Sequence, residues 1–96
     1  MPLKTVLCFG DSNTHGQMPG GTPLDRFTPD QRWPGVLRQQ LGPTWYVLEE
    51  GLSGRTTVHN DHIEGNLKNG RDYLRPCLMS HAPLDLVILL LGTNDL

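Results

Sequence analysis

Three short apolar runs divide the chain, and each leads into a turn that contains glycine and polar residues. The first run, 6–9, ends in Gly10-Asp11-Ser12, the second, 45–48, leads through two glutamates into 51–57, and the third, 86–91, ends at Gly92. Apolar runs of this length, bounded by turn residues, are typical of strands buried in a parallel sheet. We therefore predict three strands, the third covered on both faces and the first ending in an exposed turn that carries Ser12.

A helical repeat separates the first two strands. Pro34 stands near its start and Gly42 just after its end, the usual positions of these residues around a helix;. The apolar positions recur with helical spacing at Trp33, Val36, Leu37 and Leu41. This pattern predicts a short amphipathic helix, with Trp33 in the core rather than serving as a ligand platform.

A second helical face lies between the second and third strands, over about 70–81. Its members are Tyr73, Leu74, Cys77, Leu78 and His81. Pro76 falls inside the repeat, so the helix is expected either to kink or to start late. His81 is interpreted as a last-turn histidine that favours the helix C-terminus, rather than as a catalytic base.

The remaining segments are polar and irregular. Residues 17–31 are rich in Gly, Pro, Thr and Asp, which predicts a long loop at the active face, with Arg26 and Phe27 as its anchors;. His59 and His62 are three residues apart in 58–69, a spacing that can bind a metal on a helix. Because Asn60, Asp61 and Gly65 favour a turn there, we interpret 58–69 as a solvated loop without a metal;.

The alternation of strands and helices indicates an α/β fold. Right-handed crossovers would set the three strands parallel, and if the topology is flavodoxin-like the first strand lies in the middle, in the order 2-1-3. The expected architecture is a flavodoxin-like, three-layer α/β/α domain. In such a sheet, the polar residues after all three strands converge on one edge, where ligands bind.

Composition narrows the class of protein. The chain has 96 residues and a net charge of −2, without charge runs, so neither nucleic acid nor an anionic membrane is an expected partner;. The first apolar run is too short for a signal peptide or a membrane span, so we expect a soluble, cytoplasmic protein. Cys8 and Cys77 are expected to be reduced, buried thiols rather than a disulfide or a metal site.

The strand ends carry the residues that ester chemistry requires. Acyl transfer needs a nucleophile, a general base and hydrogen-bond donors aimed at the oxyanion. Ser12 is the candidate nucleophile, and the donors would be the backbone N–H groups of Ser12 and Gly54 and the side-chain amide of Asn94. Asp11 and Asp95 are interpreted as supporting residues that hold the turns by accepting backbone hydrogen bonds.

Gly10-Asp11-Ser12, Ser53-Gly54 and Gly92-Thr93-Asn94-Asp95 resemble the first three sequence blocks of the SGNH hydrolases, also called GDSL esterases and lipases. The wider stretches 8–12, 49–57 and 84–88 are similar to the bacterial arylesterase and acyltransferase branch. The resemblance implies Ser12 as nucleophile and Ser12, Gly54 and Asn94 as the oxyanion hole. It further implies small aryl or acetyl esters as substrates, including acetylated carbohydrates, with acyl transfer to alcohols as a second reaction. No cofactor is implied, and homo-oligomers are common in that branch.

One block of the family pattern is missing. The Asp-x-x-His block that supplies the base and its orienting acid does not occur, because none of His15, His59, His62 and His81 has Asp three residues before it. We therefore expect residues 1–96 to be the N-terminal part of a single SGNH hydrolase domain, nearly inactive without its C-terminal remainder. Two alternatives stay open: a flavodoxin-like module that binds phosphate or flavin, and a fragment without activity.

Overall fold

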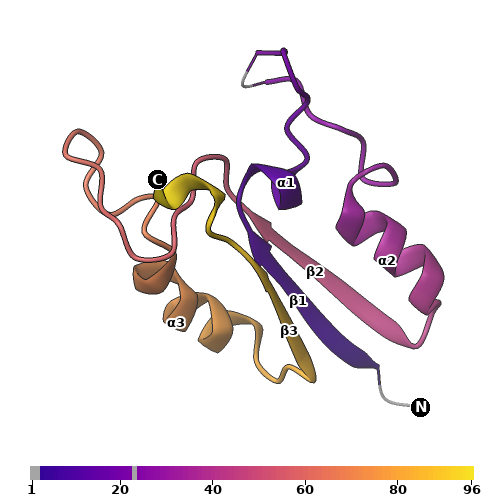
Figure 1. The fold of residues 1–96 in the computed structure, drawn as a ribbon. Coiled ribbons are helices and arrows are strands. Elements are labelled where there is room, and N and C mark those ends of the chain that lie inside the picture. Colours follow the sequence, from indigo (N-terminus) through magenta and orange to yellow (C-terminus); the bar gives the residue numbers. More distant parts are fainter. Residues whose placement is uncertain (1–2, 23) are drawn as a thin grey trace.

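The computed structural model describes residues 3–22 and 24–96. These residues include one parallel sheet of three strands (Figure 1). Its strands are β1 (Lys4–Gly10), β2 (Trp45–Gly51) and β3 (Leu86–Leu90), in the order β2-β1-β3. The predicted order and direction are confirmed. The second strand runs further than its apolar residues indicate, because Glu49, Glu50 and Gly51 pair with the last residues of β1.

The helices are α1 (Ser12–His15), α2 (Trp33–Leu41) and α3 (Gly70–His81), and a 3-10 turn, η1, spans Thr93–Asp95. The short helix predicted between the first two strands is confirmed as α2, with Pro34 near its start and Gly42 just after its end. The late start considered for α3 is wrong, since the helix begins at Gly70 and contains Pro76, with the Asn69 side chain as its cap. None of the helices in the described ranges has both the length and the apolar character needed to cross a membrane.

The two longer helices cover opposite faces of the sheet. On β1, Val6 and Cys8 face α2, whereas Leu7 and Phe9 face α3, because successive side chains of a strand point to opposite sides;. All four are fully buried, and each large apolar side chain buried in this way contributes about 1.5–3 kcal/mol to folding;. Cys8 and Cys77 are both buried free thiols, as predicted. The three-layer α/β/α architecture is confirmed.

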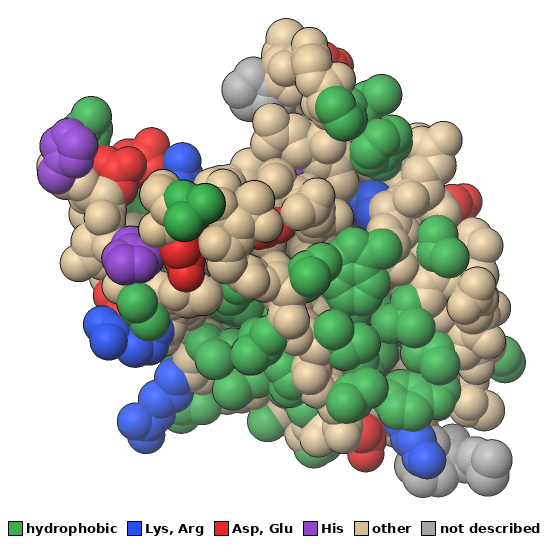
Figure 2. All heavy atoms as spheres, in the orientation of Figure 1, with side chains coloured by type: hydrophobic (Ala, Val, Ile, Leu, Met, Phe, Trp, Pro, Cys, Tyr) green, Lys and Arg blue, Asp and Glu red, His purple; other side chains and the backbone are tan. Residues whose placement is uncertain are grey.

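The apolar side chains of β3 are less covered than the sequence indicated. Leu86, Leu89 and Leu90 are 47%, 55% and 46% exposed. Figure 2 shows a broad field of hydrophobic side chains over the strands on the face in view. The expected cover is present only in part: Ile88 packs against the core on the α2 side and Val87 against the core on the α3 side, while the rest of β3, an edge strand among the described residues, is less covered.

The loop 17–31 is irregular, as predicted, and two contacts fix it to α1. The Arg26 Nε donates a hydrogen bond to the His15 carbonyl at 2.6 Å, and the Phe27 N–H donates to the Gly16 carbonyl at 2.7 Å. Both residues therefore anchor the loop, as expected, Arg26 through its side chain and Phe27 through its backbone N–H.

Candidate active site

Ser12 is the first residue of α1, the single helical turn that follows β1. The Asp11 carboxylate caps this turn by accepting a hydrogen bond from the Asn13 N–H at 3.0 Å;. Gly16 ends the turn in the left-handed region, at φ 88°;. The expected exposed turn is therefore helical, and Ser12 is half-buried because α1 packs against β1 and β2.

Gly10 allows this helix to fold back against the sheet. A Cβ at this position would lie 2.8 Å from the Leu90 carbonyl oxygen and would collide with the Thr14 hydroxyl. Only a residue without a side chain fits between β3 and α1 at this point. The place of Ser12 thus depends on the glycine two residues before it.

The turn after β2 is bonded directly to the end of β1. The Leu52 N–H donates to the Gly10 carbonyl at 3.1 Å, and Arg55 Nη1 donates to the same carbonyl at 3.1 Å. Gly54 has a φ of 84°, a conformation that glycine adopts at little cost;. The Gly10 carbonyl, just before the turn that carries Ser12, therefore accepts hydrogen bonds from both sides of Gly54 in the turn after β2.

Arg55 is a buried cation, only 4% exposed. Besides Gly10 it donates to the Glu50 carbonyl at 2.7 Å, and its guanidinium carbon lies 4.2 Å from the Phe9 ring centroid and 5.1 Å from that of Tyr73. Burial lowers the pKa of Arg55, while these two rings compensate part of the lost hydration;. Sequence reasoning did not single this residue out, although it is the one charged residue in 51–57.

The third strand end is joined to the second. The Asn94 side-chain amide donates to the Arg55 carbonyl at 3.0 Å. The Asp95 carboxylate accepts from the Thr57 N–H at 2.9 Å and from its hydroxyl at 2.6 Å. These hydrogen bonds hold the pKa of Asp95 below its usual value. The structure thus gathers all three polar signatures at the carboxyl edge of the sheet (Figure 1).

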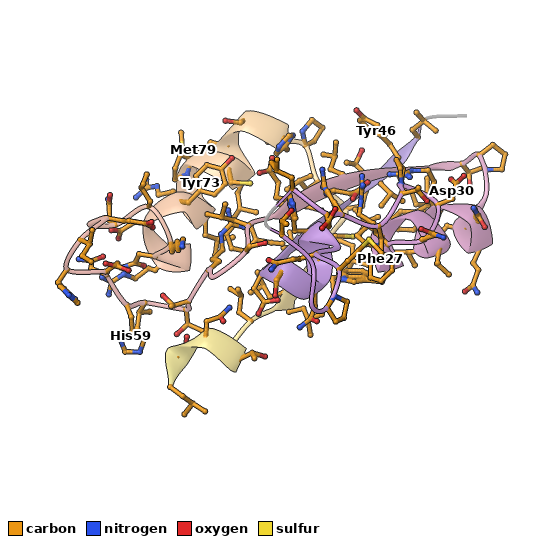
Figure 3. The ribbon with its side chains drawn as sticks, turned by 90° about the horizontal axis from the view of Figure 1, so that it is seen from above. Phe27, Asp30, Tyr46, His59, Tyr73 and Met79 are labelled. Atoms are coloured by element: carbon orange, nitrogen blue, oxygen red, sulfur yellow. The ribbon has the colours of Figure 1, made fainter. Side chains whose placement is uncertain are left out.

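Gly54 and Asn94 line the same pocket, of about 420 Å³, together with His59, His62 and Lys68. Ser12 lies on α1 at the same edge and is not among the residues that line this pocket. Figure 3 shows His59 on its loop beside η1, away from Tyr73 on α3. The 58–69 segment is a largely exposed loop, as predicted.

None of the four histidines, all within the described ranges, follows Asp by three residues, as the base of the Asp-x-x-His block would. His59 and His62 are exposed, and His81 is bonded to Glu50. His15 is close to Ser12 in sequence, and burial together with the nearby Arg26 lowers the pKa of its imidazole. Both effects favour the neutral form of the His15 imidazole.

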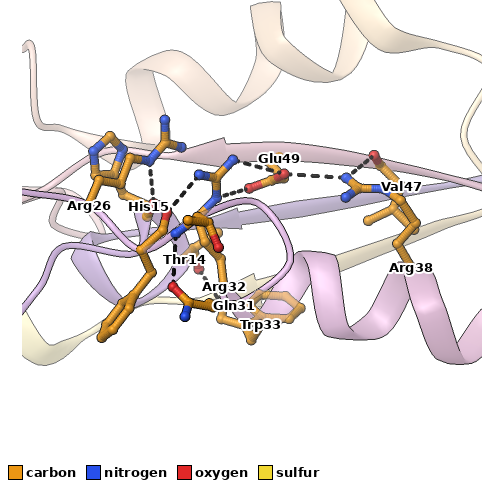
Figure 4. Close-up of polar contacts among 11 residues, drawn as sticks. Thr14, His15, Arg26, Gln31, Arg32, Trp33, Arg38, Val47 and Glu49 are labelled. Atoms are coloured by element: carbon orange, nitrogen blue, oxygen red, sulfur yellow. Dashed lines mark hydrogen bonds and ion pairs between the residues drawn. The ribbon is translucent and has the colours of Figure 1, made fainter.

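A second polar network fixes β2 to α2 (Figure 4). Glu49 Oε1 lies 2.8 Å from Arg32 Nε, and its other oxygen lies 3.3 Å from Arg38 Nη2. Burial alone would raise the pKa of Glu49, but the hydrogen bonds from the two arginines outweigh it and leave the pKa lowered. Arg32 also donates to the Phe27 carbonyl at 3.0 Å, so the same cluster holds the loop before α2.

Three solved structures show how far the likeness extends. The native aryl esterase of M. smegmatis is 57% identical, with a TM-score of 0.89 over 96% of this chain. A carbohydrate acetylesterase family member from Sinorhizobium meliloti is 46% identical, with a TM-score of 0.89 over 97% of this chain. AlinE4, an SGNH-hydrolase family esterase, is 25% identical, with a TM-score of 0.70 over 99% of this chain.

The chain spans 43% of the length of each of these three structures, which share its SGNH hydrolase fold. A comparison with the curated proteins found no match. The family model described as "GDSL-like Lipase/Acylhydrolase family" matches residues 8–96, which include the ends of all three strands. This chain therefore belongs to the GDSL-like lipase/acylhydrolase family.

Proposed function

We propose that this chain supplies the nucleophile and the oxyanion hole of a serine esterase. The observation that carries the proposal is the bonding between strand ends: Gly10 to Arg55, and Arg55 to Asn94. These contacts tie together the three turns that hold the candidate reactive groups. Geometry fixed before the substrate arrives is what makes oxyanion donors effective.

In the proposed reaction, the Ser12 hydroxyl oxygen attacks the carbonyl carbon of an ester. The backbone N–H groups of Ser12 and Gly54 and the Asn94 amide would donate to the oxyanion. An amide NH₂ has two hydrogens, and since one bonds the Arg55 carbonyl, the second is available to the substrate;. Collapse of the tetrahedral intermediate expels the alcohol and leaves an acyl group on Ser12, which water or another alcohol then removes.

The general base is proposed to come from an Asp-x-x-His block outside these 96 residues. The relatives are more than twice as long as the stretch they share with this chain, which supports residues 1–96 as the N-terminal part of one SGNH hydrolase domain. Loss of the serine or histidine of the subtilisin triad costs about 10⁶ in kcat. Residues 1–96 alone should therefore have almost no turnover.

The substrates proposed are small carboxylic esters with aryl or acetyl groups, among them acetylated carbohydrates. The names of the similar structures, an aryl esterase and a carbohydrate acetylesterase family member, support this range. The cytoplasmic location and the homo-oligomer expected from the sequence stay predictions. The alternative of a phosphate-binding or flavin-binding module is less well supported, because β1 leads into a four-residue helix.

The test uses a chimera in which residues 1–96 replace the matching part of the M. smegmatis aryl esterase. We expect this chimera to hydrolyse p-nitrophenyl acetate and to be labelled at Ser12 by a fluorophosphonate, as mass spectrometry of its peptides would show. Ser12→Ala should abolish both, whereas Ser80→Ala, on α3, should change neither. Turnover retained by a folded Ser12→Ala chimera would remove Ser12 from the mechanism.

A further inference from the structure

Three metal-ligating side chains meet where α3 packs on β2. Cys77 and His81 are four residues apart on α3, so they lie on one face of the helix;. Glu50 reaches the same place from β2. One donor atom from each side chain, the carboxylate oxygen, the thiol sulfur and an imidazole nitrogen, lies within 4.8 Å of the other two.

We propose that Glu50, Cys77 and His81 form a binding site for one divalent transition metal ion, with Zn²⁺ as the ion that fits best. The donor set selects the metal class, since thiolate and imidazole favour zinc, whereas calcium and magnesium take oxygen ligands. This proposal does not depend on the esterase proposal, because none of the three residues belongs to the oxyanion hole or the nucleophile turn.

Small side-chain movements would convert the observed arrangement into a tetrahedral site. Zn–N and Zn–O bonds of about 2.0–2.1 Å set neighbouring donors roughly 3.3 Å apart. His81 Nε2 and Glu50 Oε2 are now 2.9 Å apart, so their separation must increase by a few tenths of an ångström. The wider separations, at most 4.8 Å, must shorten by about 1 Å toward the values that a Zn–S bond of ~2.3 Å sets;.

The three proposed ligands differ in exposure, and one side of the cluster is open to a fourth ligand. Cys77 is 1% exposed, which keeps the sulfur away from solvent, whereas the side chains of His81 and Glu50 are 27% and 22% exposed. The open side of the site is therefore the side that faces water, so a water molecule would complete the coordination. Three protein ligands and one water is a common arrangement for bound zinc.

The cluster also has the outer hydrogen bond that metal sites use to orient a carboxylate. The Tyr73 hydroxyl donates to Glu50 Oε1 at 3.0 Å, which leaves Oε2 directed at His81. Without a metal, the hydrogen bond between His81 and Glu50 links α3 to β2. With Zn²⁺ bound, the ion would replace that hydrogen bond and cross-link the same two elements, next to the Gly51 end of β2.

The sequence did not show this site. Glu50 is 27 positions before Cys77, and a Cys-x-x-x-His pair by itself is too short a signal;. Cys77 was interpreted as a buried apolar residue, which its burial supports. The Glu50 side chain completes the set only because β2 continues beyond its apolar residues, and the fold alone reveals that continuation.

Cobalt substitution followed by zinc competition tests the proposal on the purified protein. We expect one Co²⁺ per chain, with the near-ultraviolet band of a cobalt–thiolate bond, and displacement by Zn²⁺. Cys77→Ser should remove the band, and Tyr73→Phe should weaken Zn²⁺ binding about 10-fold, as loss of an outer hydrogen bond does. Cys8→Ala is the matched control, since Cys8 is a buried cysteine that faces α2, and it should keep the band.

His81→Gln provides a second test should Cys77→Ser fail to fold, because His81 is partly exposed. We expect this variant to weaken Zn²⁺ binding by more than 100-fold, beyond the ~10–100-fold range of an outer partner. The exposed His62→Gln is its control and should bind like the original protein. Cobalt binding without a thiolate band, or zinc affinity unchanged in His81→Gln, would overturn the proposal.

Discussion

The Asn94 side-chain amide donates a hydrogen bond to the Arg55 backbone carbonyl at 3.0 Å, across 39 positions of the chain. This bond orients the amide plane, so the direction of its second N–H is set by the turn after β2. Arg55 is bonded in turn to the Gly10 carbonyl, two residues before Ser12. The candidate oxyanion donors are therefore positioned by one continuous set of contacts.

Replacing Asn94 should lower catalysis without preventing substrate binding. We expect Asn94→Ala in the chimera to reduce kcat for p-nitrophenyl acetate by about 10²–10³-fold, the usual effect of losing one oxyanion donor. KM should change little, since the donor acts mainly on the transition state. Asn66→Ala, on the exposed loop before α3, is the control. An equal loss in both variants would show that the effect is not specific to Asn94.

Gly54 and Gly65 offer a matched pair for testing the turn after β2. Both have positive φ, 84° and 72°, so alanine at either position should cost roughly 1–2 kcal/mol of stability;. Only Gly54→Ala should also reduce kcat: alanine keeps the N–H, but strain at this φ and a new Cβ 3.0 Å from the Lys68 side chain would displace the proposed donor. Urea unfolding and steady-state kinetics on the same chimeras separate the two effects. Equal kcat values would remove Gly54 from the site.

Arg55 should be sensitive even to lysine. Its guanidinium donates to two carbonyl groups, of Gly10 and Glu50, and lies against two aromatic rings, those of Phe9 and Tyr73. A lysine ammonium cannot reproduce this planar geometry, so at least one of these two carbonyls loses its hydrogen bond from residue 55, at a cost of about 1–3 kcal/mol. Arg55→Lys should lower the urea midpoint accordingly, whereas Arg75→Lys, exposed on α3, should not. A midpoint like that of the original protein would contradict the positioning role.

The sequence was informative wherever one local pattern determined the outcome. Helix α2 was predicted because spacing, proline and glycine all agreed, and the sheet order followed from right-handed crossovers in a flavodoxin-like topology;. The roles of Arg55 and Glu50 were missed because both depend on contacts between distant segments. A pattern of apolar residues cannot show where a charged side chain is buried, since charged groups enter a core only when the fold supplies partners.

The free energy of unfolding should decrease at acid pH, because Glu49 becomes protonated and its ion pairs with the two arginines are lost. The arginines hold the pKa of this carboxyl below its ordinary value of 4.5, so the folded state favours the charged form. Its contribution is fully present above about pH 4.5 and is lost as the pH falls through the lowered value in the folded protein;. The difference in urea midpoint between the original protein and Glu49→Gln should be smaller at pH 3 than at pH 7. The same difference at both pH values would contradict the assignment.

The exposed edge of β3 should make residues 1–96 self-associate. Leu86 and Leu90 are exposed on one face of β3 and Leu89 on the other, beside the unpaired backbone groups of an edge strand, and such an edge can pair with a second strand;. Leu89→Lys should therefore reduce association in sedimentation velocity measurements, since a charge on an edge strand opposes pairing. Met79→Lys adds the same charge at an apolar position of α3 that is 69% exposed, and it should leave association unchanged. Both substitutions add one positive charge. A similar decrease in both variants would therefore assign the effect to net charge and contradict a special role for the edge of β3.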